Sequence, residues 1–325
     1  MNLAHTTRRL WITAAASYIA LPQLALAQAA RPISLIVSYP SGGGADLMAR
    51  LIAPHLGTHL GQTVVVDNKP GASGQIAAAF VAKAAPDGNT LLLDASSFAV
   101  NPSLFAKLPY DSDKDFTPLG VLALYPNVLV CHPGFEAKSV KDVIRLAKAS
   151  PGKIAYASSG NGSAQHLAGA LFESRTGVQL VHVPYRGGGP ALNDVMGGQV
   201  PLFFANVASS LGHIQSGRLR PLGVTSRLAT RAMPEIPSME QSGVANYEVL
   251  EWNPVLGPAG MPADLTSRLR DALKKAMAEP EVLARVRSLS GEVFLDNSSA
   301  AVPNFLKAQQ TQWARLIKER SIVAG

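Results

Sequence analysis

The fold of this chain is decided by residues 33–46, which read Ile33-Ser34-Leu35-Ile36-Val37-Ser38-Tyr39-Pro40-Ser41-Gly42-Gly43-Gly44-Ala45-Asp46. The apolar run at the start predicts a buried strand. Three glycines follow, and from Asp46 onward the apolar residues recur at the spacing of one helix face. Glycines let backbone N–H groups point inward, and a helix N-terminus adds unpaired N–H donors. The stretch predicts a cradle for a carboxylate or phosphate, or else a tight turn that holds no ligand.

A nucleotide site does not fit the same glycines. A phosphate-binding P-loop needs Gly-Lys followed by Ser or Thr after its glycines, whereas Ala45-Asp46 stands there. The dinucleotide-binding pattern needs a Gly or Ala at position 47, which is Leu47. A small anion is the better expectation.

The first residues predict an exported protein. Arg8-Arg9 precedes an apolar run from Leu10 to Leu26, and Ala25-Leu26-Ala27 fits the rule for a cleavage site. We expect residues 1–27 to be a cleaved signal peptide and the protein to be periplasmic, not membrane-embedded. The run is interrupted by Pro22 and is shorter than the ~20 apolar residues of a membrane span.

The charge and cysteine content of the chain limit the kinds of partner and cross-link that we expect. The net charge of +7 is a modest excess without a long basic run, so nucleic acid is not an expected partner. Cys131 is the only cysteine and cannot form an internal disulfide, so we expect it to be buried among apolar residues. Nothing in the sequence calls for a cofactor.

Strands and helices alternate after the glycine loop. Residues 63–66 and 90–93 read as further strands, and Ser73 is expected to cap a helix that runs to Ala84. Such alternation predicts a parallel sheet, whose ligands bind beyond the carboxyl ends of the strands. This places Ser96 and Ser97 on the same rim as residues 39–46.

A second unit repeats this architecture. A crossing strand at 121–130 precedes a helix that Ser139 caps, and a strand at 154–157 leads into the small-residue loop 158–163 and another helix. Further strands are expected at 180–183, 200–204 and 219–225. Two such loops, one in each unit, could hold one anion from both sides.

The chain then crosses back. Residues 247–256 are apolar and extended, and amphipathic helices at 264–278, 281–289 and 302–317 are expected to pack on the first unit. The prediction is an α/β protein with a discontinuous first lobe (28–125 and 252–325), an inserted second lobe (126–251) and two hinge crossings. Each lobe holds a parallel-type sheet flanked by helices.

Several motifs carry a resemblance to a known family. They are residues 39–46, Asn68 to Gly74, Ala84 to Gly88, Asn101 to Phe105, His182 to Gly187, Gly197 to Val200 and Leu222 to Ser226. In this order they resemble the Bug family of periplasmic solute-binding proteins, the receptors of tripartite tricarboxylate transporters. The resemblance covers nearly the whole chain after the signal peptide. It implies a Venus-flytrap fold whose two facing loops hold a carboxylate through backbone amides.

The ligand-binding set expected from the rim and the resemblance comes from both lobes. The first lobe supplies Tyr39, Ser41, Gly42, Gly43, Gly44, Ala45, Asp46, Ser96 and Ser97. The second supplies Gly160, Asn161, Gly162, Ser163, His166, Tyr185, Arg186, Ala205 and Asn206. The family usually has Lys and Asp where this chain has Arg186 and Ala205. A guanidinium without a nearby acid predicts a second anionic group on the ligand.

Other classes of function require motifs that can be compared with this sequence. A serine hydrolase needs Gly-x-Ser-x-Gly, which the loop around Ser163 does not supply. His55 and His59 lie one helical turn apart but lack the Glu of zinc hydrolases, so a solvated helix face is favoured over a metal site. We expect a monomeric, non-catalytic receptor that delivers a small organic acid to membrane transporter subunits. A sensor kinase as partner, or an exported α/β enzyme acting on a carboxylate, are the alternatives.

Overall fold

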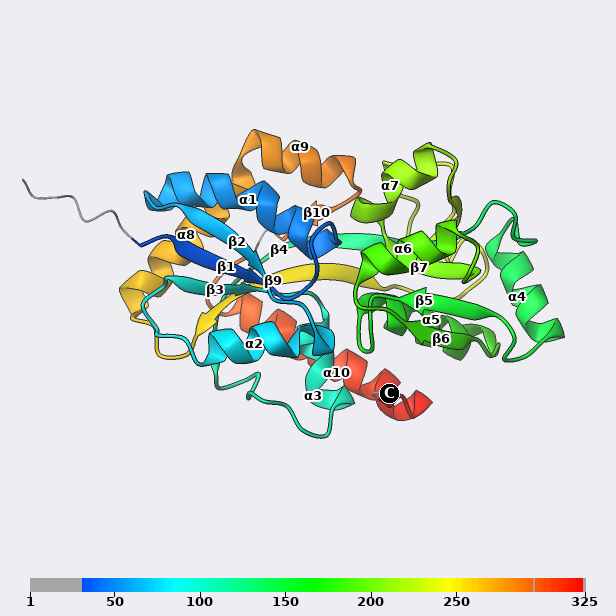
Figure 1. Cartoon of the computed structure of the whole chain (residues 1–325), viewed down its shortest axis with the longest axis horizontal. Helices are drawn as coiled ribbons and strands as arrows, with labels where there is room; N and C mark the ends of the chain where they lie inside the picture. The colour runs from blue at the N-terminus through cyan, green and yellow to red at the C-terminus, as the bar shows by residue number, and fades with distance from the viewer. Residues whose placement is uncertain (1–30, 295, 324–325) are drawn as a thin grey trace, which may run out of the picture. The chain divides into compact units, whose positions relative to one another are not determined.

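Strands and helices alternate along most of the chain in the computed structural model, which describes residues 31–294 and 296–323 (Figure 1). The strands are β1 Ile33–Val37, β2 Val64–Asn68, β3 Thr90–Leu93, β4 Phe116–Cys131, β5 Ala155–Ser158, β6 Val181–Pro184, β7 Leu202–Asn206, β8 Arg220–Val224, β9 Leu250–Pro258 and β10 Glu292–Val293. The helices are α1 Gly44–Leu60, α2 Gln75–Ala82, α3 Ser97–Leu104, α4 Val140–Ala149, α5 Ala164–Thr176, α6 Gly188–Met196, α7 Val207–Gln215, α8 Ala263–Ala278, α9 Pro280–Ser288 and α10 Ala301–Arg320. The α/β class is confirmed.

The sheet has two parallel parts joined by antiparallel strands. Its order is β2-β1-β3-β9-β4-β7-β5-β6, with β8 and β10 also paired to β4. Strands β2, β1 and β3 are mutually parallel, as are β6, β5 and β7. Because the antiparallel strands β9 and β4 lie between them, the parallel parts are separate, and each has its own rim of carboxyl ends.

The long strand β4 belongs to both parts. Its residues Phe116 to Pro126 pair with β9, whereas Asn127 to Cys131 pair with β7 and β8. Figure 1 shows β9, in yellow, running alongside β4 between the two groups of helices. The two predicted crossing stretches are therefore neighbouring strands, and the partner of β4 changes after Pro126.

Apolar side chains form cores on both faces of the sheet. One core holds Leu35 of β1, Ile52 of α1 and Leu273 of α8, all nearly inaccessible to solvent. Another holds Tyr156 of β5 and Phe172 of α5. The strand and helix order therefore follows from apolar faces that can only be buried against neighbouring elements.

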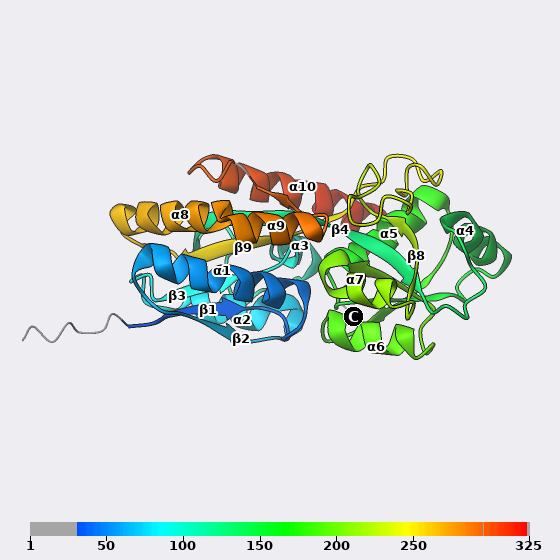
Figure 2. The same ribbon diagram turned by 90° about the horizontal axis from the view of Figure 1, so that it is seen from above.

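Helix α10 departs from the expectation that the last helices pack on the first unit. Val302 and Leu306, near its start, lie in a core with Trp252, but Trp313, Leu316 and Ile317 lie in the core that also holds Phe172. Figure 2 shows α10, in red, extending from the side of α8 toward α5. The helix is 20 residues long, so its length allows its two ends to contact both groups of elements.

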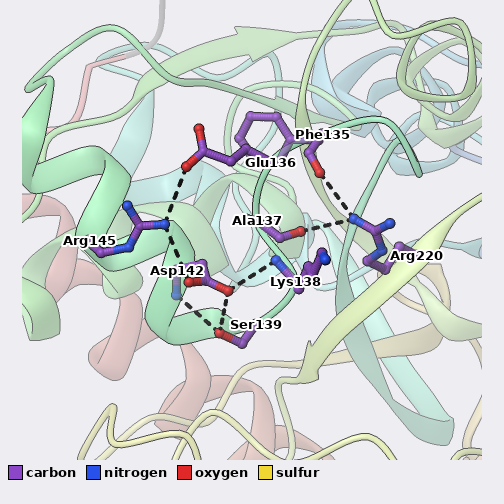
Figure 3. A network of polar contacts seen from close by, with 8 residues as sticks. All are labelled: Phe135, Glu136, Ala137, Lys138, Ser139, Asp142, Arg145 and Arg220. Carbon is purple, nitrogen blue, oxygen red and sulfur yellow. Dashed lines mark hydrogen bonds and ion pairs between the residues drawn. The ribbon is translucent and has the colours of Figure 1, made fainter.

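The predicted cap of α4 is confirmed. Ser139 Oγ accepts a hydrogen bond from the Asp142 N–H, and the Asp142 carboxylate accepts from Ser139 Oγ in return (Figure 3). Beside this helix start, the Arg220 guanidinium donates to the carbonyls of Phe135 and Ala137. These contacts hold the segment between β4 and α4 in place.

The predicted cap at Ser73 is wrong. Ser73 has a left-handed backbone (φ 54°), and α2 begins at Gln75 after Gly74, which is also left-handed (φ 87°). A Cβ at Gly74 would lie 2.9 Å from the Asp94 carboxylate, so this turn approaches β3 closely and turns Ser73 out of the helix. The Ser73 hydroxyl instead donates to the Asn161 carbonyl at 2.5 Å.

Two further expectations concern cysteine and the chain start. Cys131 is fully buried, as predicted, and burial raises the pKa of its thiol to about 11.

The predicted signal peptide lies outside the described residues. Within residues 31–294 and 296–323, no helix is both long enough and apolar enough to cross a membrane.

Candidate ligand-binding site

The glycine loop presents free backbone donors where α1 begins. Gly43 is the N-cap residue, and no side chain caps the helix there. The Gly42 N–H donates to Asp46 Oδ2 and the Gly43 N–H to the Pro40 carbonyl. Within the described part of the chain, the N–H groups of Gly44, Ala45 and Asp46 have no hydrogen-bond partner. Three such donors at one helix start can bind an anion.

Asp46 builds this loop. Its buried carboxylate accepts hydrogen bonds from the Gly42 N–H at 2.9 Å, Asn68 Nδ2 at 3.0 Å and Arg50 Nε at 3.0 Å. Burial opposes ionisation of Asp46, but the hydrogen bonds from Arg50, Gly42 and Asn68 lower its pKa below the usual value. The carboxylate is therefore ionised at neutral pH, and its role is to fix the loop at the helix N-terminus.

The second small-residue loop uses most of its donors internally. The Gly160 N–H donates to Ser158 Oγ, the Gly162 N–H to His166 Nδ1 and the Ser163 N–H to the Gly160 carbonyl. Ser163 caps α5 by accepting from the His166 N–H. This loop is a rigid support, with fewer free amides than the loop before α1.

His166 lies against a second histidine. Its ring stacks on that of His182 with centroids 3.8 Å apart and an angle of 3° between the planes. Burial lowers the pKa of His166 to about 4 and that of His182 to about 3. Both rings are neutral at pH 7, and His166 accepts from Gly162 rather than carrying charge to a ligand.

A small cavity lies between the glycine loop and elements of the second parallel part. Its volume is about 40 Å³. The residues that line it are Tyr39, Pro40, Gly43, Gly44, Ala45, Ala95, Ser159, Gln165, Gly188, Gly189, Phe203, Asn206, Ser209 and Glu251. Five of the residues expected to bind ligand are among them, namely Tyr39, Gly43, Gly44, Ala45 and Asn206.

The other expected residues are not among those that line this cavity. They are Ser41, Gly42, Asp46, Ser96, Ser97, Gly160, Asn161, Gly162, Ser163, His166, Tyr185, Arg186 and Ala205. Several of them support its wall: Ser97 Oγ accepts from the Tyr39 hydroxyl at 3.0 Å, and Ser96 donates to Glu251.

Arg186 and Ala205, on which the second-anion hypothesis rests, are not among the residues that line this cavity. Arg186 is exposed, and it makes no ion pair within the described residues. Strand β6 ends at Pro184 and α6 begins at Gly188, so the turn between them directs Gly188 and Gly189 to the cavity instead. Ala205 is fully buried in a core of the sheet. Arg186 is therefore not among the residues that line this cavity, and its contact with a ligand stays a prediction.

Two buried polar residues that line the cavity, Glu251 and Gln165, were not expected from the sequence. Glu251 Oε1 accepts from the N–H and the hydroxyl of Ser96, and Oε2 accepts from Gln165 Nε2 at 2.9 Å. The only sequence signal for Glu251 is an acidic residue inside an otherwise apolar stretch.

A second buried acid lies near Glu251. Asp94 follows β3, is fully buried and accepts hydrogen bonds from Ser38 Oγ at 2.5 Å and the Ala95 N–H at 2.7 Å. Burial raises the pKa of Asp94 to about 7, and burial also raises the pKa of Glu251. No ion pair within the described residues includes either carboxylate.

The histidines of α1 contact α9. His55 Nε2 lies 3.4 Å from Glu281 and His59 Nε2 lies 2.8 Å from Glu279. Within residues 31–294 and 296–323, no group of three or more His, Cys, Asp or Glu residues is placed to hold a metal ion. These contacts assign the two histidines to helix packing.

Comparison with known proteins gives consistent results. Residues 48–322 match the family described as the tripartite tricarboxylate transporter family receptor. The protein BugT of Bordetella pertussis is 34% identical over 321 residues, which cover 98% of both chains.

Solved structures agree in fold. The R. palustris protein Rpa4515 with adipate (TM-score 0.87, 32% identity) covers 90% of this chain and 98% of its own. The periplasmic binding protein BugD (TM-score 0.86, 33%) covers 90% and 99%. MatC from Rhodopseudomonas palustris with bound malate (TM-score 0.84, 26%) covers 89% and 99%. The fold is the two-lobed α/β fold of periplasmic binding proteins.

Proposed function

Because this chain belongs to the tripartite tricarboxylate transporter receptor family, we propose that it captures a small organic acid in the cavity lined by Gly43, Gly44 and Ala45. One observation carries the proposal. Gly44 and Ala45, whose N–H groups are free within the described residues, line this cavity, and no Lys or Arg is among its lining residues. These free backbone amides are the donors that we propose for one carboxylate, beside neutral side chains such as Asn206.

Solved structures of two similar proteins contain small organic acids. Rpa4515 is described with adipate and MatC with malate, and both are dicarboxylates. In this chain, one carboxylate would bind at the N-terminus of α1, and the remainder of the acid would contact polar groups such as the Tyr39 hydroxyl and Asn206. The second loop, 160–163, would support the site from the second lobe. It would supply few hydrogen-bond donors to the ligand, because most of its N–H groups already have partners close by in the sequence.

Binding requires the two lobes to move. The cavity of about 40 Å³ is small, and we infer that it widens to admit a dicarboxylate. The proposed lobes are residues 28–125 with 252–325, and residues 126–251. Hinges at the crossing segments of β4 and β9 would open and close them around the ligand.

The receptor would work in the periplasm after removal of the signal peptide, as a monomer that delivers the acid to a membrane transporter. It would not catalyse a reaction on the acid. The family match and the description of BugD as a periplasmic binding protein support this setting.

Mass spectrometry of the acid that co-purifies with the native protein, followed by calorimetry with that acid, tests the proposal. Malate and adipate serve as the first probes. We expect saturable binding of an acid at one site per chain and an unchanged ligand after prolonged incubation. Failure to bind any carboxylate, or conversion of the acid to a product, would contradict the proposal.

A further inference from the structure

Glu251 brings a negative side chain to the proposed carboxylate site. It stands second in β9, opposite Tyr125 of β4, and only 6% of its surface is exposed. It lines the same cavity as the glycine loop before α1. An acid in the wall of a site for acids needs a reason, because two buried carboxylates repel each other.

The contacts of Glu251 show that it acts as a hydrogen-bond acceptor. The Ser96 N–H and hydroxyl donate to Oε1 at 3.3 and 3.2 Å, and Gln165 Nε2 donates to Oε2 at 2.9 Å. The second hydrogen of the Gln165 amide serves Asn127 Oδ1 at 3.0 Å, so the orientation of this amide is fixed. A carboxylate has about four acceptor positions, so one remains for a further donor.

The protein supplies no cation for this carboxylate. Gln165, Ser96 and the Tyr39 hydroxyl are neutral at pH 7, and the other acid nearby, Asp94, is itself buried. Within the described residues, Glu251 takes part in no ion pair. A buried carboxylate without a cation is costly, and a donor on the ligand would reduce this cost.

We propose that Glu251 accepts a hydrogen bond from a hydroxyl or ammonium group of the bound acid, so that the protein selects acids carrying such a donor over plain acids of the same chain length. The inference rests on the proposed function, because it assumes that a carboxylate binds beside Glu251 at the start of α1. The donor lies at the Glu251 end of the ligand and a carboxylate at the glycine end. A plain dicarboxylate leaves the remaining acceptor position of Glu251 unused and adds a negative charge beside it.

Calorimetry on the processed protein near neutral pH tests this selection with two matched sets of acids. The first set is succinate, malate and aspartate, which differ only in carrying hydrogen, hydroxyl or ammonium on one carbon. The second is glutarate, 2-hydroxyglutarate and glutamate. In at least one set, we expect a donor-bearing acid to bind about tenfold or more tighter than the plain acid. The hydroxyl and ammonium members show which donor is preferred.

A pair of variants then assigns the effect to Glu251. Glu251→Gln keeps the shape of the side chain but removes its charge, so the preference for donor-bearing acids should fall about tenfold. Glu248→Gln is the matched control, because Glu248 lies three residues earlier, is partly exposed (37% of its side chain) and pairs with Arg227 at 3.1 Å. It should leave the preference unchanged.

Each possible result either supports or overturns the proposed role of Glu251. Plain acids that bind as tightly as their donor-bearing counterparts overturn the role of Glu251 but leave the receptor function standing, even if Glu251→Gln does not fold. An unchanged preference for donor-bearing acids in a folded Glu251→Gln protein also overturns the role of Glu251 and leaves the receptor function standing. Plain acids that bind with uptake of a proton, an uptake that is absent in Glu251→Gln, show that Glu251 is neutralised instead, which also overturns the inference. Failure of every carboxylate to bind overturns the proposed function itself.

Discussion

The Gln165 side-chain amide donates to Glu251 Oε2 at 2.9 Å and joins the first turn of α5 to strand β9. The same nitrogen donates to Asn127 Oδ1 on β4 at 3.0 Å. One buried amide therefore contacts both crossing strands where β4 changes its pairing partner. A change in these hydrogen bonds would therefore affect how β4 and β9 are held where they join the two parallel parts of the sheet.

Removing this amide should destabilise the protein. Gln165→Met keeps a similar volume but leaves Glu251 Oε2 and Asn127 Oδ1 each without a donor, so we expect a loss of roughly 2 to 4 kcal/mol in the free energy of unfolding. Urea denaturation measures it. Gln199→Met is the control, because Gln199 is exposed and donates only to the carbonyl of Gly197. Equal losses in the two variants would contradict a role for the buried amide.

The glycines of the loop before α1 have different tasks. Gly42 has a left-handed backbone (φ 81°) with open space where a Cβ would stand, whereas a Cβ on Gly44 would lie 3.0 Å from the Asn206 side chain. Gly42→Ala should therefore cost about 1 to 2 kcal/mol of stability through backbone strain. Gly44→Ala should weaken ligand binding, because it displaces Asn206 in the cavity wall.

Calorimetry and urea denaturation on the two glycine variants separate these effects. An affinity loss for malate or adipate about tenfold larger in Gly44→Ala than in Gly42→Ala is expected. If Gly44→Ala binds like wild type, the start of α1 is not the carboxylate site. Gly43 has an ordinary backbone (φ −78°), so a Cβ at this position does not meet the backbone strain expected at Gly42.

The buried acid Asp94 predicts a pH dependence of stability. Its pKa is about 7 in the folded protein, against about 3.9 for an unfolded chain. Between these values the folded state keeps a proton that the unfolded state has lost. This contribution to stability therefore falls as pH rises from about 4 to about 7, and is constant above, with an upper limit of roughly 4 kcal/mol.

Asp94→Asn should remove this contribution. Urea denaturation of both proteins at several pH values between 5 and 8 gives the difference in free energy of unfolding. We expect the variant to gain stability relative to wild type as pH rises, because the asparagine does not ionise. A difference that is independent of pH would show that Asp94 is ionised in the folded protein throughout this range.

The sequence predicts the scaffold of the site better than its lining. The glycine loop, the start of α1 and the strands around them follow from apolar patterns and from glycine spacing, which are local properties. Glu251 was missed because it lies in an apolar stretch that predicts a strand but not which side chains face a cavity. Ser73 was misplaced because the close approach to Asp94, a contact between distant segments, decides where α2 begins.

Arg186 shows how a short turn alters a prediction based on strand ends. It follows β6 closely, which places it near the rim, but the helix that begins at Gly188 turns it toward solvent. Arg186→Ala and Arg186→Lys should therefore each change the affinity for malate or adipate by less than about 1 kcal/mol, as is typical of exposed charges. Calorimetry on both variants measures this. A loss of roughly 2 kcal/mol or more in Arg186→Ala, only partly restored by Lys, would mean that the guanidinium binds the ligand when the lobes close around it.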